Sequence, residues 1–241
     1  MKIFRWLFIG ILVIVLVGTI GLVGWATVSA QEATARAVEV LRVNDVQRAD
    51  GQLVFRPNSP NGKGLIYYPG GLVDPEAYAV TAQGLADAGY LVVIPQMPLN
   101  LAFTGINRAG GIQAAFPEIE SWVIGGHSLG GAMAAEYAKN NVDRLDGLIM
   151  FASYPANNAD FVDFPIPILT IIGSADPGAP NQEAFYAEIS ESAERFIIEG
   201  GNHRQFADYS FQKGDGIATI TAAEQQDQII AATIRFLDML K

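Results

Sequence analysis

The sequence of 241 residues contains no cysteine and only two histidines, His127 and His203. The absence of cysteine excludes disulfides, thiolate nucleophiles and cysteine-bound metals. The two histidines are the only candidates for the side chain that most often acts as a general base. Basic residues are also few, because 15 Lys and Arg stand against 25 Asp and Glu and give a net charge of −10. This balance argues against nucleic acid and other anionic polymers as partners.

Charged residues are also missing between Trp6 and Trp25, a stretch that follows the basic residues Lys2 and Arg5. As a helix this stretch spans roughly 28 Å, close to the hydrocarbon thickness of a bilayer. The sequence therefore predicts an N-terminal transmembrane helix whose N-terminus lies in the cytoplasm. The alternative is a signal peptide cleaved before Gln31, because small residues precede that position.

Both interpretations place the rest of the chain outside the cytoplasmic membrane, in a single-pass membrane protein or in a secreted one. We expect residues 1–30 to form a membrane anchor or signal segment, residues 31–37 a tether, and residues 38–241 one domain. Beyond the first 30 residues, 25 acidic residues face 13 basic ones. Such a surface keeps a domain dispersed in water.

Apolar runs alternate with helical segments over the rest of the chain. Asp74 and Pro75 are typical of a helix start, as N-cap and first helical residue. Strands that are apolar throughout and alternate with helices predict an α/β fold, with a mostly parallel sheet covered by helices on both faces. The predicted strands are 37–43, 52–57, 64–69, 90–95, 121–126, 145–153, 166–173 and 195–200, and the predicted helices are 74–89, 107–115, 129–139, 181–190 and 222–240.

Ser128 lies in the pattern Gly126-His127-Ser128-Leu129-Gly130, between a predicted strand and a predicted helix. In a G-x-S-x-G turn the serine is lifted out of the strand-helix junction, and the glycines let the neighbouring backbone pass without Cβ clashes. A serine hydroxyl becomes a useful nucleophile when a base removes its proton. The pattern and its context predict that Ser128 is such a nucleophile, whereas a serine in an ordinary glycine-rich loop is the alternative.

The base that serves Ser128 is expected to be His203, directly after the strand predicted at 195–200. The other histidine, His127, is adjacent to Ser128, and adjacent side chains on such a turn diverge. We expect His127 to pack or form hydrogen bonds beneath the turn.

The acid is expected between the serine and the histidine in chain order, at the end of a strand. Asp176 meets both conditions, because it follows the apolar strand predicted at 166–173. Asp160 and Asp163 precede that strand and therefore fall at the opposite edge of the sheet. An ordinary turn aspartate is the alternative role for Asp176.

Two backbone N–H groups are needed to stabilise the negative charge that develops on a carbonyl oxygen. One is expected from Leu129, the residue after the nucleophile. The other is expected from the loop after the strand 64–69, where Gly71 is the first candidate and Leu72 the second. Glycine lets the backbone approach a substrate closely.

The motifs YYPGG, PLNLAF, GGHSLGG and GNHRQF follow one another along the chain. In these motifs the sequence resembles the α/β-hydrolase superfamily over about residues 38–240, and more narrowly its small bacterial membrane-anchored members. The resemblance implies Ser128 as nucleophile, Asp176 as acid, His203 as base, and Gly71 with Leu129 as oxyanion donors. Dienelactone hydrolases are similar in size and order but use a cysteine nucleophile, which this chain lacks. Pro69 stands where many members have a His-Gly pair, so the oxyanion loop departs from the common pattern.

The segment 153–165 is the only insertion of note and predicts a minimal lid over an open site. The loop 96–103 is expected to form an apolar wall of the substrate pocket. An apolar wall without a cationic group favours an uncharged ester of small or medium size, and the segment KGDG (213–216) is expected to be a turn. The residues predicted for the pocket are Leu72, Met97, Leu99, Leu101 and Phe103.

The sequence therefore predicts a serine hydrolase that cleaves carboxylic esters through an acyl-enzyme. An amidase, lactonase or thioesterase with the same three residues is an alternative. A non-catalytic binding module on a hydrolase scaffold is another, since fold alone does not set function. We expect no metal and no cofactor.

Overall fold

In the computed structural model, the described residues are 2–189 and 193–240. Ser190, the last residue of the helix predicted at 181–190, lies outside the described residues, as do the chain ends Met1 and Lys241. The chain divides into two compact units, residues 1–30 and residues 31–241.

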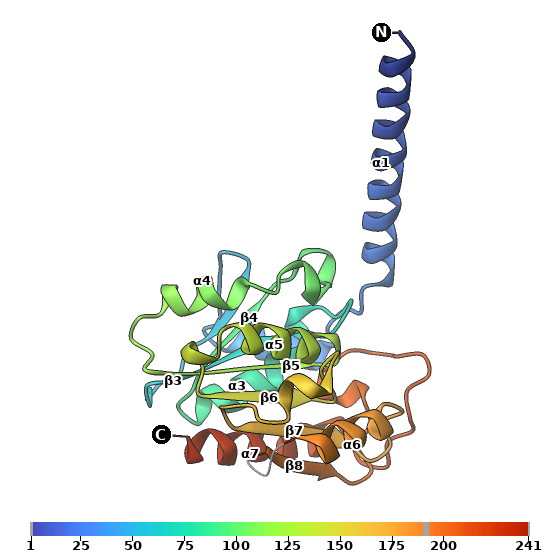
Figure 1. The fold of residues 1–241 in the computed structure, drawn as a ribbon. Helices are drawn as coiled ribbons and strands as arrows, with labels where there is room; N and C mark the ends of the chain where they lie inside the picture. The colour runs from blue at the N-terminus through green and yellow to red at the C-terminus, as the bar shows by residue number, and fades with distance from the viewer. Residues whose placement is uncertain (1, 190–192, 241) are drawn as a thin grey trace. The chain divides into compact units, whose positions relative to one another are not determined.

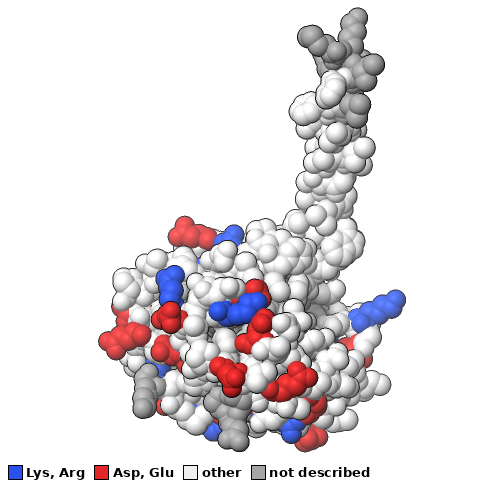
Figure 2. Space-filling view, viewed as in Figure 1, with Lys and Arg blue, Asp and Glu red and all other residues white. Residues whose placement is uncertain are grey.

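The first unit is a continuous helix, α1 (Lys2–Ser29). Among the described residues it is the one helix long and apolar enough to cross a membrane, with a mean hydropathy of 2.5 over Gly10–Ser29. Its described side chains carry no charge (Figure 2). Signal sequences share this length and composition, so α1 fits either a signal segment or an anchor.

The second unit is built on an eight-stranded sheet of order β1-β2-β4-β3-β5-β6-β7-β8 (Figure 1). The strands from β3 to β8 run parallel, while the hairpin β1–β2 joins the edge at β4 in antiparallel pairing. Parallel strands end at the same sheet edge, so the loops after them gather there. The strands are β1 (Gln47–Ala49), β2 (Gln52–Phe55), β3 (Lys63–Tyr68), β4 (Leu91–Pro95), β5 (Ser121–His127), β6 (Gly147–Phe151), β7 (Ile168–Gly173) and β8 (Ala193–Ile198).

Helices cover both faces of the sheet, as the sequence predicts. In β6, Ile149 and Phe151 pack into the core on one face, and Leu148 and Met150 into the core on the other. This alternation is the two-residue period of a strand buried on both sides. The first face is covered by α2 (Ala35–Val43), α3 (Ala79–Asp87) and α7 (Ala222–Met239), and the second by α4 (Arg108–Ala115), α5 (Leu129–Asn140) and α6 (Ala179–Glu188).

Short 3-10 helices connect several of these elements. The helix predicted at 74–89 forms as η1 followed by α3, and it begins as expected: the Asp74 carboxylate accepts a hydrogen bond from the Glu76 N–H (2.9 Å), and Pro75 is the first residue. Between β6 and β7 the chain forms only η5. The short helices are η1 (Pro75–Tyr78), η2 (Pro98–Asn100), η3 (Ala102–Thr104), η4 (Val142–Arg144), η5 (Asn158–Phe161) and η6 (Arg204–Phe206).

The strand predicted at 37–43 is wrong, because this segment lies in the helix α2. Ala37 and Leu41 are buried four residues apart, on one face of the helix. The Arg42 guanidinium donates two hydrogen bonds to the Glu39 carboxylate, at 2.7 and 2.6 Å. The apolar-charged alternation of these few residues imitates a strand, but their packing and the i,i+3 ion pair fit a helix.

Residues 31–37, expected as a tether, are part of the second unit. Gln31 pairs with Val73 in a parallel bridge, and the Thr34 N–H donates to the Asp208 carbonyl oxygen (2.8 Å). The Arg36 guanidinium forms an ion pair with the Asp208 carboxylate (3.1 Å). The folded unit therefore begins at Gln31.

The surface of the folded unit agrees with the acidic composition. On the face in view, Figure 2 shows acidic side chains scattered among uncharged ones, with no continuous cluster of basic residues among those described. This face offers no footprint of the kind that binds a phosphate backbone.

Candidate active site

Ser128 lies at the turn between β5 and α5, with φ 54° and ψ −123°. This backbone conformation is strained for a residue with a Cβ and persists only where the surroundings enforce it. The Ser128 N–H donates to the Phe151 carbonyl oxygen (3.0 Å) of β6. The turn therefore has the geometry of a nucleophile elbow.

Glycines let α5 pack against the strand ends beside Ser128. A Cβ at Gly126 would lie 2.6 Å from the Gly130 oxygen, and a Cβ at Gly130 would lie 2.7 Å from the Tyr68 carbonyl carbon. A Cβ at Gly131 would lie 2.5 Å from the Ser153 Cβ. Each of these approaches is closer than real Cβ atoms allow, so the elbow requires glycine at the three positions.

His203 and Asp176 are brought together from the loops after β8 and β7. The His203 Nδ1 lies 2.8 Å from the Asp176 Oδ2. Asp176 is buried, and its carboxylate also accepts hydrogen bonds from the Gly178 N–H (2.7 Å) and the Gln182 amide (3.2 Å). These bonds fix the carboxylate, which in turn orients the imidazole and leaves its Nε2 as the atom available to a nucleophile.

Ser128, Asp176 and His203 line one cavity with a volume of about 510 Å³. No hydrogen bond among the described residues joins the Ser128 hydroxyl to His203. Such bonds often form only when substrate is bound. The remaining lining is Leu129, Ala132, Ala152, Ser153, Tyr154, Pro155, Ala156, Pro177, Gly178, Gln182, Gln212, Lys213, Gly214 and Asp215.

The apolar wall expected from the loop 96–103 is not part of this cavity. Of the residues predicted for it, Met97 packs into the core on the second face of the sheet, Leu101 is buried, and Phe103 is 56% exposed. The loop folds into η2 and η3 and is held by the Leu72 N–H, which donates to the Asn100 carbonyl oxygen (2.6 Å). None of Leu72, Met97, Leu99, Leu101 and Phe103 is among the described residues that line the cavity.

The backbone N–H groups beside the elbow differ in their availability. The Gly70 N–H donates to a tyrosine hydroxyl (2.7 Å), and the Leu72 N–H is bonded to Asn100. Among the described residues, no hydrogen bond uses the N–H of Gly71 or Leu129. A Cβ at Gly71 would lie 3.0 Å from the Leu129 Cδ2, so the two predicted donors are neighbours. Leu72, the second candidate, already has an acceptor.

Asp215, in the KGDG segment, supports the loop that carries His203. Its Oδ1 accepts from the N–H groups of His203 (3.1 Å) and Gly216 (2.8 Å), and its Oδ2 accepts from the Arg204 N–H (2.8 Å). The segment is a turn, as expected, because the Asp215 N–H donates to the Gln212 carbonyl oxygen (3.3 Å). This support is not among the features predicted from the sequence, although aspartate side chains in turns often accept hydrogen bonds from backbone N–H groups.

His127 lies beneath the elbow, where its side chain is 1% exposed. Its Nδ1 lies 3.0 Å from the Tyr78 hydroxyl, and its Nε2 lies 3.1 Å from the His203 carbonyl oxygen. Burial and the nearby His203 ring hold the pKa of His127 well below its usual value, so the ring is neutral. Both ring nitrogens are engaged, and His127 has none left to serve Ser128.

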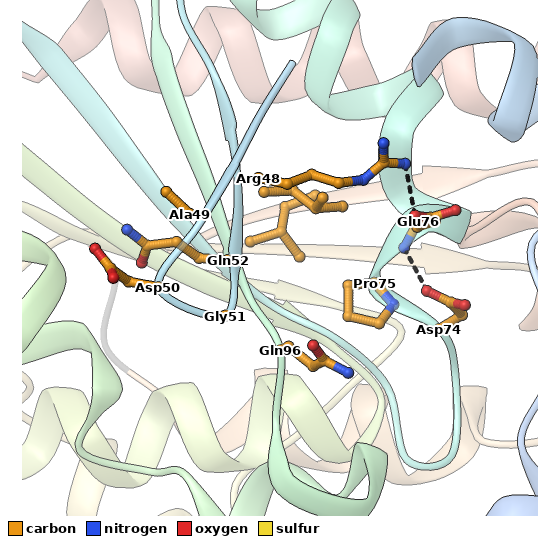
Figure 3. Close-up of a pocket in the computed structure, with 11 residues that line it drawn as sticks. Arg48, Ala49, Asp50, Gly51, Gln52, Asp74, Pro75, Glu76 and Gln96 are labelled. Carbon is orange, nitrogen blue, oxygen red and sulfur yellow. Dashed lines mark hydrogen bonds and ion pairs between the residues drawn. The ribbon is translucent and has the colours of Figure 1, made fainter. Parts of the chain in front are cut away.

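A second cavity, of about 310 Å³, lies beside the β1–β2 hairpin (Figure 3). Its Arg48 guanidinium pairs with the Glu76 carboxylate (2.7 Å), and the Glu76 N–H is capped by Asp74. No serine, histidine or lysine of the described residues lines this cavity. The second cavity therefore lacks the serine and the histidine that the cavity at Ser128 brings together.

Comparison with solved structures supports the same fold. Est1E from Butyrivibrio proteoclasticus is 14% identical with a TM-score of 0.59, covering 79% of this chain and 97% of its own. Dienelactone hydrolase from Anabaena variabilis is 15% identical with a TM-score of 0.62, and the match covers 79% of this chain and 92% of that protein. The esterase domain of a Rhodothermus marinus protein is 14% identical with a TM-score of 0.56, and the match covers 76% of this chain and 92% of that domain. Another Est1E structure has ferulic acid bound.

No curated protein sequence matches the chain. A family model does match it, over residues 64–227. This span runs from the second residue of β3 to beyond β8 and includes Ser128, Asp176 and His203. The chain therefore belongs to the alpha/beta hydrolase family.

Proposed function

We propose that the protein is a serine hydrolase that cleaves carboxylic esters, with Ser128 as nucleophile, His203 as base and Asp176 as the acid that orients the base. One observation carries the proposal: the bonded pair of His203 and Asp176 opens on the same cavity as a serine held in a strained elbow. A buried carboxylate that orients an imidazole beside a raised serine is the arrangement that acyl transfer needs.

In the first step, the Ser128 Oγ attacks the ester carbonyl carbon while its proton passes to the His203 Nε2. The N–H groups of Gly71 and Leu129 stabilise the resulting oxyanion. The intermediate collapses when the ester C–O bond breaks, and the alcohol leaves with the proton from His203. Water then attacks the acyl-enzyme with His203 again as base, which releases the acid and restores Ser128.

The proposed substrate is an ester of small or medium size. Beyond its catalytic groups the cavity has small and apolar side chains, among them Leu129, Ala132 and Pro155. Lys213 also lines it, so the expectation of a pocket without a cationic group is wrong. Its volume falls within the range of sites for small molecules. Esterases are among the structural neighbours, and one of them has ferulic acid bound.

The test is labelling with a fluorophosphonate, followed by mapping of the modified peptide. We expect one adduct, on Ser128, because this serine has a positioned base. Ser153 is the internal control, since it lines the same cavity but donates its hydroxyl proton to the Ser128 carbonyl oxygen (2.7 Å). A panel of p-nitrophenyl esters of graded chain length, with matched amides, lactones and thioesters, then defines the preferred bond. An adduct on another serine would overturn the assignment of Ser128 as nucleophile. The absence of any adduct on the folded protein would favour the binding-module alternative.

We further propose that α1 is a retained membrane anchor and that the folded unit lies outside the cytoplasm. The full-length protein is expected to fractionate with membranes and to resist washing with high salt, because burial of apolar surface holds it there. Protease added to spheroplasts is expected to reach the folded unit. A soluble mature protein whose N-terminus is Gln31 would instead establish α1 as a cleaved signal.

A further inference from the structure

Three hydrogen bonds, two of them fully buried, connect the loop after β3 to the His203 loop through the elbow. The Gly70 N–H donates to the Tyr78 hydroxyl at 2.7 Å. The same hydroxyl lies 3.0 Å from the His127 Nδ1, and the His127 Nε2 lies 3.1 Å from the His203 carbonyl oxygen. Tyr78 and His127 are both buried, with exposures of 0% and 1%. The mechanism uses neither side chain.

Only one assignment of donors and acceptors is possible for these three hydrogen bonds. A carbonyl oxygen only accepts, so the His127 Nε2 carries the hydrogen and donates it to His203. The Nδ1 of the neutral ring is then an acceptor, and the Tyr78 hydroxyl donates to it while accepting from Gly70. Burial raises the pKa of Tyr78 well above its usual value, so the hydroxyl keeps its proton. Every polar atom in the chain of bonds is satisfied.

The bonds join three segments that lie far apart in the sequence. Gly70 precedes Gly71 in the loop after β3, His127 precedes Ser128, and His203 follows β8. The His127 ring lies 4.6 Å from the His203 ring, centroid to centroid, and stacks on Phe206 at 5.7 Å. A displacement of this ring would therefore move the catalytic loops relative to one another.

The Gly70 position is fitted closely to the same two side chains. A Cβ at Gly70 would lie 3.0 Å from both the His127 Nδ1 and the Tyr78 hydroxyl. The backbone of the loop therefore lies in close contact with the Tyr78 and His127 side chains, whose hydrogen bonds from Gly70 to His203 we call the relay. The next peptide group of the loop carries the Gly71 N–H.

We propose that Tyr78 and His127 are positioning residues that hold the Gly71 N–H and the His203 imidazole in register with Ser128. This inference rests on the proposed function. Neither residue touches the reacting atoms. They act through the backbone of Gly70 and His203, which is the kind of supporting contact that preorganised sites depend on.

The first test is Tyr78→Phe, which removes the hydroxyl and leaves the ring. We expect kcat on a p-nitrophenyl ester to fall about 10- to 100-fold, with KM changed less than about threefold, because the displaced Gly71 N–H acts mainly in the transition state. Affinity for a trifluoromethyl ketone, which forms an oxyanion on the serine, is expected to fall in parallel with kcat/KM.

Tyr67→Phe is the matched control. Tyr67 is buried, its ring lies 5.0 Å from that of Tyr78, and its hydroxyl has no hydrogen-bond partner among the described residues. This variant is expected to keep wild-type kcat and ketone affinity. The comparison separates loss of the relay from loss of a buried tyrosine hydroxyl.

His127 makes two bonds of the relay, one from the Tyr78 hydroxyl and one to the His203 carbonyl oxygen. The variants His127→Gln and His127→Asn are expected to remove one bond each. A glutamine Nε2 can replace the donor to His203, whereas an asparagine Oδ1 can replace the acceptor from Tyr78. We expect Tyr78→Phe to cost much less kcat in the His127→Gln background than in the wild type, because that half of the relay is already lost. In the His127→Asn background, Tyr78→Phe is expected to keep most of its effect.

Several outcomes would overturn the proposal. If Tyr78→Phe kept wild-type kcat and ketone affinity, or lost thermal stability alone, the hydroxyl would have no positioning role. If Tyr78→Phe failed to fold, unchanged kcat in both His127 variants would lead to the same conclusion. These results presuppose a wild type that is labelled at Ser128 and hydrolyses esters. A wild type that does neither overturns the proposed function, and the relay with it.

Discussion

Replacing His203 with alanine is expected to lower kcat on an ester substrate by on the order of 10³ to 10⁶. In the proposed mechanism the imidazole takes the Ser128 proton and later returns one to the leaving alcohol, and the alanine can do neither. Asp176 supports the ring from a buried position through the 2.8 Å contact with Nδ1. Asp176→Asn is therefore expected to reduce kcat by less than His203→Ala but by more than a replacement of His127 by glutamine. The amide can orient the ring but cannot stabilise its charged form.

The matched comparison uses the second histidine. His127→Gln keeps a donor for the His203 carbonyl oxygen, and we expect it to lose about tenfold in kcat through a disturbed elbow. Both variants are measured on one p-nitrophenyl ester, with circular dichroism to verify that each is folded. A His127→Gln variant as inactive as His203→Ala would mean that the wrong histidine has been assigned as base.

The elbow is predictable from the sequence because its requirements are local. The glycines at 126, 130 and 131 meet backbone from the strand ends and from their own turn, and the strand-helix context is visible in the apolar pattern. Asp176 and His203 are predictable for another reason, since parallel strands deliver the residues after them to one sheet edge. The order of these residues along the chain then leaves few candidates.

Other parts of the site are set by contacts that no local pattern reveals. The loop 96–103 is apolar enough to suggest a pocket wall, but the Leu72–Asn100 hydrogen bond ties it into a fold that buries Met97 and Leu101. The wall of the cavity comes instead from segments after β6 and β7 and from Gln212–Asp215.

Long-range partners also explain the helix α2, where the sequence pattern predicts a strand. Residues 37–43 are too few for their periodicity to distinguish the two structures, and the burial of Ala37 and Leu41 against the core decides between them. The Tyr78–His127 contact is of the same kind, because 49 positions separate the two residues in sequence. The sequence shows a polar residue beneath the elbow but not the bonds it makes.

Two replacements of Ser128 are expected to separate the backbone strain at the elbow from the loss of the hydroxyl. Ser128→Ala and Ser128→Gly both remove the proposed nucleophile, so both are expected to lower kcat by on the order of 10⁵ to 10⁶. They differ in stability. At φ 54° and ψ −123° a residue with a Cβ is strained by about 1–3 kcal/mol. Alanine keeps the Cβ and therefore the strain, whereas glycine has no Cβ and relieves the strain.

Glycine also gives the unfolded chain more freedom, which offsets about 0.5–1 kcal/mol of that relief. The free energy of unfolding of Ser128→Gly is therefore expected to exceed that of Ser128→Ala by about 1 kcal/mol, and urea denaturation of the two variants measures the difference. Because the hydroxyl is absent from both, the contrast isolates the backbone. A Ser128→Gly variant less stable than Ser128→Ala would mean that the elbow is relaxed, and that the raised position of Ser128 requires no stored strain.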